Sequence, residues 1–225
     1  MNYRDKAVEL FSWALQQPRA SVDWQSHSKD VARACEKIAE AAGMDKDLAY
    51  AKGLLHDVYK AVERDNEVFV EVDGESVMAL THPFRGYQLL MDKNFPEAAR
   101  AALTHTFYNV YEVLDGGFDL KMIPDDLALL KKWLSENEYD DYDKLTQLVD
   151  NMVGWKGVMT IDDRFCDILT RHQVANPQAS LRKLYELKDY FDEKIGGNIY
   201  ELFKDEICRT AITEPTRKPQ IKKVA

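Results

Sequence analysis

Cysteine is scarce in this sequence, and its three copies do not pair along the chain. Cys35, Cys166 and Cys208 are widely separated, and none belongs to a Cys-X-X-Cys motif. An odd number of isolated cysteines argues against a disulfide framework and against a cysteine zinc site. We therefore expect three reduced thiols, as in a protein of a reducing compartment.

Long apolar runs are also missing. No segment approaches the roughly 20 apolar residues that a membrane-spanning helix needs. The first residues, MNYRDKAVELFSWALQQ, resemble an amphipathic helix and lack the apolar core of a secretory signal. The expected location is the cytoplasm, with no membrane partner.

Positive charge is in deficit, because 30 Lys and Arg residues stand against 39 Asp and Glu residues, for a net charge of −9. Duplex nucleic acid and anionic membranes both attract basic surfaces, so this balance argues against either as a partner. An anionic substrate would need local cations. Bound metal ions can supply such cations inside one pocket of an acidic protein.

Apolar material is abundant, at 45% of the residues, and 31% are charged. This composition is typical of a folded protein with a sizeable core, and we predict one domain. Most of the chain shows helical spacing of apolar residues, with capping residues and prolines at the expected starts. We predict an all-α fold with helices over the N-terminal residues and over 28–42, 46–56, 84–91, 97–104, 127–135, 142–153, 161–172, 177–195 and 198–210.

Two segments depart from the helical pattern. Val68, Val70 and Val72 alternate with other residues up to Asp73-Gly74, which predicts a small β-hairpin near residues 68–78. Beyond residue 212 the sequence is rich in proline and basic residues, so we expect a flexible basic tail over 213–225.

Four of the five histidines stand near predicted helix ends, together with carboxylates: His27, His56 beside Asp57, His82 and His105. His56 and Asp57 follow an apolar run, so their helix delivers them to a place where an unpaired charge would be costly. A bound cation would relieve that cost. A His-Asp pair bonded to backbone would explain two residues but would leave the other histidines as coincidence.

This set resembles the HD-domain superfamily of metal-dependent phosphohydrolases, whose pattern is a His, a His-Asp doublet and a distant Asp. The chain supplies His27, then His56-Asp57 in GLLHDVYK, then Asp150 in YDKLTQLVDNM. His82 in THPFRGYQLL and His105 in ALTHTF resemble the further histidines of a di-metal branch that includes bacterial symmetrical diadenosine tetraphosphate hydrolases. The resemblance covers roughly residues 26–172 and implies an HD-type helical bundle, which we place at residues 1–212.

The resemblance also implies two divalent transition-metal ions that share Asp57. The first ion would be held by His27, His56, Asp57 and Asp150, and the second by Asp57, His82 and His105. Nitrogen and oxygen ligands without thiolate suit Fe, Mn, Co, Ni or Zn better than Ca or Mg, and the resemblance favours iron or manganese. Asp57 would then be catalytic, because it would hold both ions, and the hydroxide bound to them would attack phosphorus.

Two basic residues are expected to bind substrate phosphate. Lys60 stands four residues after His56, where the family's common HDxxK form has a lysine, and would also neutralise charge in the transition state. Arg85 stands three residues after His82 and could bind phosphate in a bidentate manner. A solvated surface position explains either residue about as well. Arg164 is a weaker candidate for the same role.

The expected function is hydrolysis of a phosphoester or phosphoanhydride in a nucleotide or related small phosphorylated metabolite. Two alternatives stay open. One is a di-iron oxygenase, similar to the inositol-oxygenase type of HD protein, with the same six ligands. The other is a nucleotide-sensing module without turnover. Lys60 and the hydrolase-like segment MTIDDRFCDILTRH favour hydrolysis, and the presence of all six ligands argues against the sensing module.

Overall fold

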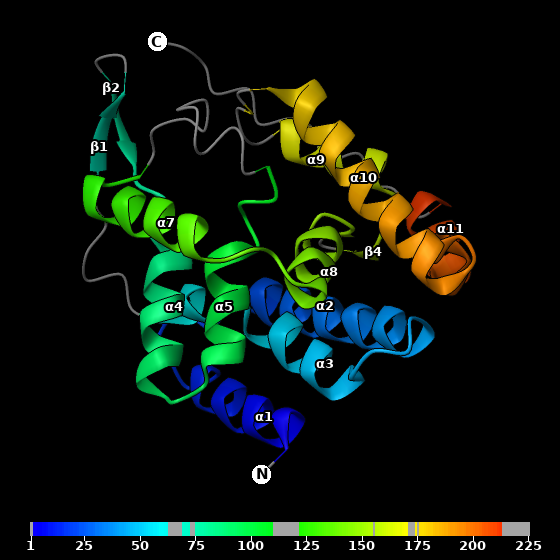
Figure 1. The fold of residues 1–225 in the computed structure, drawn as a ribbon, viewed down its shortest axis with the longest axis horizontal. Helices are drawn as coiled ribbons and strands as arrows, with labels where there is room; N and C mark the ends of the chain where they lie inside the picture. Colours follow the sequence, from blue (N-terminus) through cyan, green and yellow to red (C-terminus); the bar gives the residue numbers. More distant parts are fainter. Residues whose placement is uncertain are drawn as a thin grey trace.

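The computed structural model of the chain describes residues 2–62, 69–72, 75–109, 122–154, 156–170, 174 and 176–212. These residues are mostly helical, which confirms the predicted all-α class (Figure 1). The first half contains α1 (Tyr3–Ala14), α2 (Val22–Ala41), α3 (Lys46–Leu55), η1 (Val58–Ala61), β1 (Phe69–Val72), β2 (Glu75–Met78), α4 (His82–Asp92) and α5 (Pro96–Thr104). The second half contains α7 (Pro124–Glu136), α8 (Asp141–Asp150), β3 (Val153–Gly154), β4 (Gly157–Val158), α9 (Ile161–Leu169), α10 (Pro177–Ile195), η2 (Ile199–Phe203) and α11 (Lys204–Ile212).

Capping residues explain most helix starts. The Asp45 side chain accepts hydrogen bonds from the first turn of α3, and the Thr160 hydroxyl accepts one from Asp163 in α9. Helix α2 begins at Val22, six residues before the predicted start, because the Ser21 side chain caps its first turn. The serine was the signal for this earlier start.

Helix α8 ends at Asp150, so the predicted helix over 142–153 was wrong in its last turn. Val153 and Gly154 instead pair with Gly157 and Val158 in a short antiparallel hairpin. Gly157 has φ +109°, a conformation that favours glycine. Similarly, the segment predicted as one helix over 198–210 is a 3-10 turn, η2, followed by α11.

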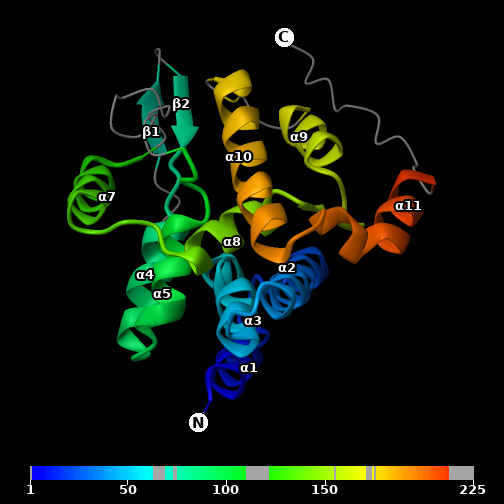
Figure 2. The same cartoon turned by 45° about the vertical axis from the view of Figure 1, so that its right-hand side comes forward.

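The predicted hairpin near residues 68–78 is confirmed. Strand β1 pairs with β2 in antiparallel register, with Phe69 opposite Met78 and Val72 opposite Glu75. The two strands project at the edge of the helical body in both views (Figures 1 and 2). The predicted turn residues Asp73 and Gly74, and the predicted tail over 213–225, lie outside the described residues.

Helices α2 and α3 form the centre of the fold, with α1 packed on α3 and with α4 and α5 side by side (Figures 1 and 2). Helices α8 and α10 cover α2 from the other side, where Cys35, Ile38, Leu148 and Leu187 join one apolar cluster. None of the helices in the described part of the chain has the length and apolar character of a membrane-spanning segment.

A buried charge network ties α3, α5 and α8 together. Lys52 of α3 is 1% exposed, and its Nζ lies 3.4 Å from Oδ1 of Asp143 in α8. The Nε atom of Arg100 in α5 donates to Oδ2 of the same aspartate at 2.5 Å. Because one buried carboxylate takes two cations from two helices, it fixes how the three helices lie relative to one another.

Gly53 allows α3 to pass close to α2. A Cβ atom at Gly53 would lie 2.9 Å from the Cα atom of Ala32 and 3.1 Å from the Val31 carbonyl oxygen. We expect Gly53→Ala to lower the free energy of unfolding by about 1–3 kcal/mol, as overpacked cores do, in chemical denaturation. Gly197→Ala is the control, because its Cβ would meet nothing within 4 Å. Equal stabilities of the two variants would contradict this account.

Candidate metal centre

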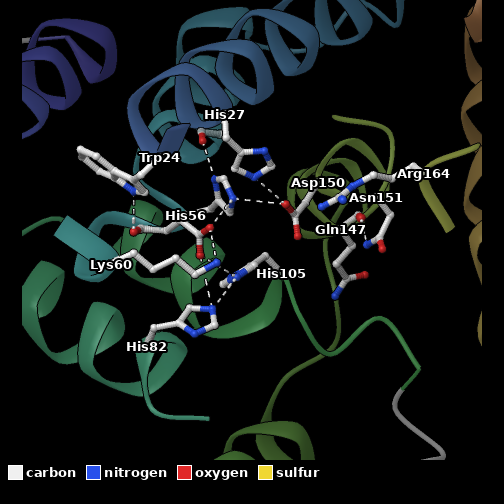
Figure 3. A network of polar contacts seen from close by, with 12 residues as sticks. Trp24, His27, His56, Lys60, His82, His105, Gln147, Asp150, Asn151 and Arg164 are labelled. Atoms are coloured by element: carbon white, nitrogen blue, oxygen red, sulfur yellow. Dashed lines mark hydrogen bonds and ion pairs between the residues drawn. The ribbon is translucent and has the colours of Figure 1, made fainter. Parts of the chain in front are cut away.

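Three helix C-termini meet at one place in the molecule. Helix α3 is followed by its C-cap His56, α5 is followed by its C-cap His105, and α8 ends at Asp150. The C-terminal end of a helix carries about half an elementary negative charge, so these ends together favour a cation between them. His27 of α2 and His82, the first residue of α4, also point toward this place (Figure 3).

Backbone carbonyls orient two of the imidazole rings. Nδ1 of His56 lies 2.7 Å from the Gly53 carbonyl oxygen, and Nδ1 of His105 lies 2.9 Å from that of Ala102. A carbonyl can only accept, so each Nδ1 carries the hydrogen and donates it. In the neutral ring the lone pair is then on Nε2, which faces the cluster. Histidines that bind metal are held in this way.

Asp57 faces a different set of histidines with each carboxylate oxygen. Its Oδ1 lies 3.3 Å from Nε2 of His82 and 3.3 Å from Nε2 of His105. Its Oδ2 lies 3.5 Å from Nε2 of His56. The carboxylate of Asp57 therefore stands between two groups of nitrogen donors.

Asp150 completes the side of the cluster that contains His27. Its Oδ1 lies 3.0 Å from Nε2 of His27 and 3.4 Å from Nε2 of His56. On the other side, Nε2 of His82 and Nε2 of His105 are 3.3 Å apart. All six predicted ligands thus lie in one cluster, although they come from positions 27 to 150.

The cluster contains buried atoms without hydrogen bonds. His56 is 1% exposed and Asp57 is 3% exposed, yet Nε2 of the first and Oδ1 of the second make no hydrogen bond within the described part of the chain. Such an atom costs about 1–3 kcal/mol when it stays unpaired. Coordination of a divalent cation would remove that cost, so the residues present fit a metal centre.

Three groups of donor atoms have a spacing suitable for a metal ion, with all atoms of a group within 4.8 Å of one another. They are His27, His56 and Asp57; His56, His105 and Asp150; and Asp57, His82 and His105. The third group contains the three residues predicted for the second ion, and the first group contains three of the four predicted for the first ion, without Asp150. The second group combines His56 and Asp150, predicted for the first ion, with His105, predicted for the second.

Comparison with known protein families agrees with this geometry. The HD domain model matches residues 24–153, which is more than half of the 225-residue chain. The chain belongs to the HD-domain family. No curated protein and no solved structure matches it. HD-domain proteins form a superfamily of metal-dependent phosphohydrolases, and all six cluster residues lie in the matched range. The diadenosine tetraphosphate hydrolase branch stays a prediction.

The charges in this HD-domain cluster depend on one another. Burial would lower the pKa of His56, but Asp57 and Asp150 raise it to about 10. Burial would raise the pKa of Asp57, but Lys60 and His56 hold it well below its usual range. Burial and the charge of Lys60 lower the pKa of His82. The carboxylate of Asp57 is therefore ionised and His82 is neutral, whereas His56 holds a proton that a bound metal ion would have to displace from Nε2.

The two predicted phosphate-binding residues occupy different surroundings. Nζ of Lys60 lies 2.6 Å from Oδ2 of Asp57, and its side chain is 44% exposed, so it stands on the solvent side of the HD cluster. Arg85, in the first turn of α4, donates to the Gln88 side chain at 3.0 Å and places its charge near the buried Asp126. The structure thus brings Lys60 into contact with the cluster. Arg85 instead makes its hydrogen bond to Gln88, another residue of α4.

Two residues that the sequence analysis missed support the HD ligands. Nε1 of the buried Trp24 donates to the Asp57 carbonyl oxygen at 2.9 Å. Nε2 of Gln147 donates at 3.0 Å to the carbonyl oxygen of Thr104, the residue before His105. Trp24 fits a helical core position, and no local signal connects it to a residue 33 positions away.

Proposed function

We propose that this HD-domain protein hydrolyses a phosphoester or phosphoanhydride bond in a nucleotide or a related small phosphorylated metabolite. The observation that supports the proposal best is the position of Asp57, whose two oxygens face separate groups of histidines inside one buried cluster. A carboxylate shared in this way is suited to two ions that act together on a phosphoryl group. We propose further that the protein acts in the cytoplasm and does not bind duplex nucleic acid.

Two divalent transition-metal ions would occupy the cluster. We propose His27, His56, Asp57 and Asp150 as ligands of one ion, and Asp57, His82 and His105 as ligands of the other. Iron or manganese is favoured, and cobalt, nickel or zinc also suit these donors. Thiolate does not compete at these sites, because none of the metal-ligand groups among the described residues contains a cysteine, and burial raises the pKa of the Cys35 thiol.

Each side chain has a separate task in the proposed reaction. The bound ions would supply an acidified water and would withdraw charge from the phosphoryl oxygens. Asp57 holds the two halves of the centre together. Lys60, on the solvent side, would donate hydrogen bonds to a phosphate oxygen and oppose the negative charge that develops there. We propose Arg85 as a further phosphate ligand, and binding would require its side chain to leave Gln88.

The alternatives predict different measurable products. A di-iron oxygenase with the same ligands would consume oxygen when substrate is added and would release no phosphate. A nucleotide-sensing module would bind a nucleotide without converting it. The contact between Lys60 and Asp57 favours hydrolysis, because it places an ammonium group where a phosphate oxygen would approach.

The test is to purify the protein without oxygen, measure its metal content, and supply mononucleotides and dinucleoside polyphosphates one at a time. We expect about two ions per chain and phosphate or nucleotide release that stops with a chelator and returns with added iron or manganese. A fully metal-loaded protein that converts none of these compounds, or that consumes oxygen instead, would contradict the proposal.

A further inference from the structure

Arg164 is a largely buried cation whose guanidinium is only partly paired. The side chain is 14% exposed, and Nη1 donates to Oδ2 of Asp167 at 2.6 Å. Nε is buried and makes no hydrogen bond with any residue that the structure describes. The guanidinium is always charged and its N–H groups form a rigid fork, so the edge formed by Nε and Nη2 can receive a bidentate partner. An unpaired buried donor is costly, which indicates that such a partner is missing.

The close-up view in Figure 3 shows this guanidinium directed toward the metal centre. In Figure 3 the Arg164 side chain extends past Asn151 toward Asp150. Its stem rests against β3, because a Cβ atom at Gly154 would lie 3.8 Å from Cδ of Arg164. Arg164 therefore stands on the Asp150 side of the cluster, whereas Lys60 stands on the opposite side, against Asp57 (Figure 3).

The acidic residues closest to Arg164 in sequence have other partners. Asp162 accepts a hydrogen bond from the Tyr185 hydroxyl at 2.5 Å. Asp163 accepts one from the Thr160 hydroxyl at 2.7 Å and belongs to the cap of α9. Within α9, only Asp167 pairs with Arg164, and it uses the Nη1 end. An anion from outside the chain fits the other edge.

We propose that Arg164 binds a phosphate group of the substrate through Nε and Nη2. Two parallel N–H donors match two oxygens of a phosphate. Because Lys60 and Arg164 lie on opposite sides of the cluster, they suit a substrate with phosphate on both sides of the cleaved bond. The inference rests on the proposed hydrolase function and narrows its substrate class to phosphoanhydrides.

Replacement of Arg164 by glutamine tests the proposal in the metal-loaded protein. We expect the KM for a nucleoside triphosphate or a dinucleoside polyphosphate to rise at least about tenfold, the size expected for a charged hydrogen bond, with kcat changed less than about threefold. The KM for a nucleoside monophosphate should change less. Arg164→Lys keeps the charge but loses the fork, so it should recover only part of the affinity.

A binding measurement makes the test independent of turnover. Methylenediphosphonate, a pyrophosphate analogue whose P–C–P bridge cannot be hydrolysed, titrated into wild type and Arg164→Gln by calorimetry, should bind about tenfold more weakly to the variant. Asp167→Asn is the structural control, because it breaks the ion pair within α9 but keeps the guanidinium, and its KM should stay within about twofold of wild type. Circular dichroism checks that each variant is folded.

The outcomes separate this inference from the proposed function. If wild type converts phosphoanhydrides and Arg164→Gln keeps the wild-type KM and the wild-type affinity for methylenediphosphonate, Arg164 has only a structural role and the inference is wrong. If Arg164→Gln does not fold, the same KM and binding measurements on Arg164→Lys are compared with wild type instead. If methylenediphosphonate binding depends on Arg164 but no phosphorylated compound is converted, the phosphate site stands and the hydrolase proposal fails.

Discussion

Replacing Asp57 with asparagine is expected to remove both metal ions and to slow phosphate release by about a thousandfold. The amide would keep the shape of the side chain but would offer one oxygen in place of two. The oxygens of Asp57 face His56 on one side and His82 with His105 on the other, so one change weakens both groups of ligands. Metal content by elemental analysis and steady-state phosphate release measure the two effects.

Asp126→Asn is the matched control for this variant. Asp126 is also buried, at 4% exposed, and its Oδ2 makes no hydrogen bond with the described residues, but it lies in the first turn of α7, outside the cluster. Burial raises its pKa, so the neutral amide should be accepted there with little change in rate. An Asp57→Asn protein that keeps two ions and a rate within about tenfold of wild type would contradict the shared-carboxylate model.

The ligands could be predicted because their signals are local. His56 and His105 each follow an apolar helical run, and a residue at the end of such a run is delivered to the buried side of its helix. The resemblance to the HD family then connected positions that are far apart, from His27 to Asp150. The structure places these residues together, and the family match covers them all.

The supporting contacts could not be predicted because both partners are needed to recognise them. Lys52 is a buried cation only because Asp143, 91 positions later, and Tyr142 lie over it. The indole of Trp24 reaches a carbonyl oxygen, and every residue has one, so the sequence carries no mark of the acceptor. The same holds for Arg164. Its unpaired Nε can be recognised only once Asp162 and Asp163 are known to have other partners.

His82→Ala is expected to lose one of the two ions and to keep the other. Within the described part of the chain, Nε2 of His82 contacts Asp57 and His105, and it makes no ion pair or hydrogen bond with His27 or Asp150. Its removal should therefore weaken only the group that it shares with Asp57 and His105. Elemental analysis should give about one ion per chain, and phosphate release should fall by about a hundredfold or more, because one ion cannot act on both the attacking and the leaving oxygen.

The reciprocal variant His27→Ala decides between two ions and one. His27 contacts Asp150 on the opposite side, so this variant should also keep about one ion, and its unfolding temperature should still rise when the metal is added. The group of His56, His105 and Asp150 offers a competing arrangement, with a single central ion. A single ion held at that point touches neither His27 nor His82 directly, so wild type would hold about one ion and both variants would keep it. Two ions in wild type, with a different one lost from each variant, require Asp57 to be shared between two sites.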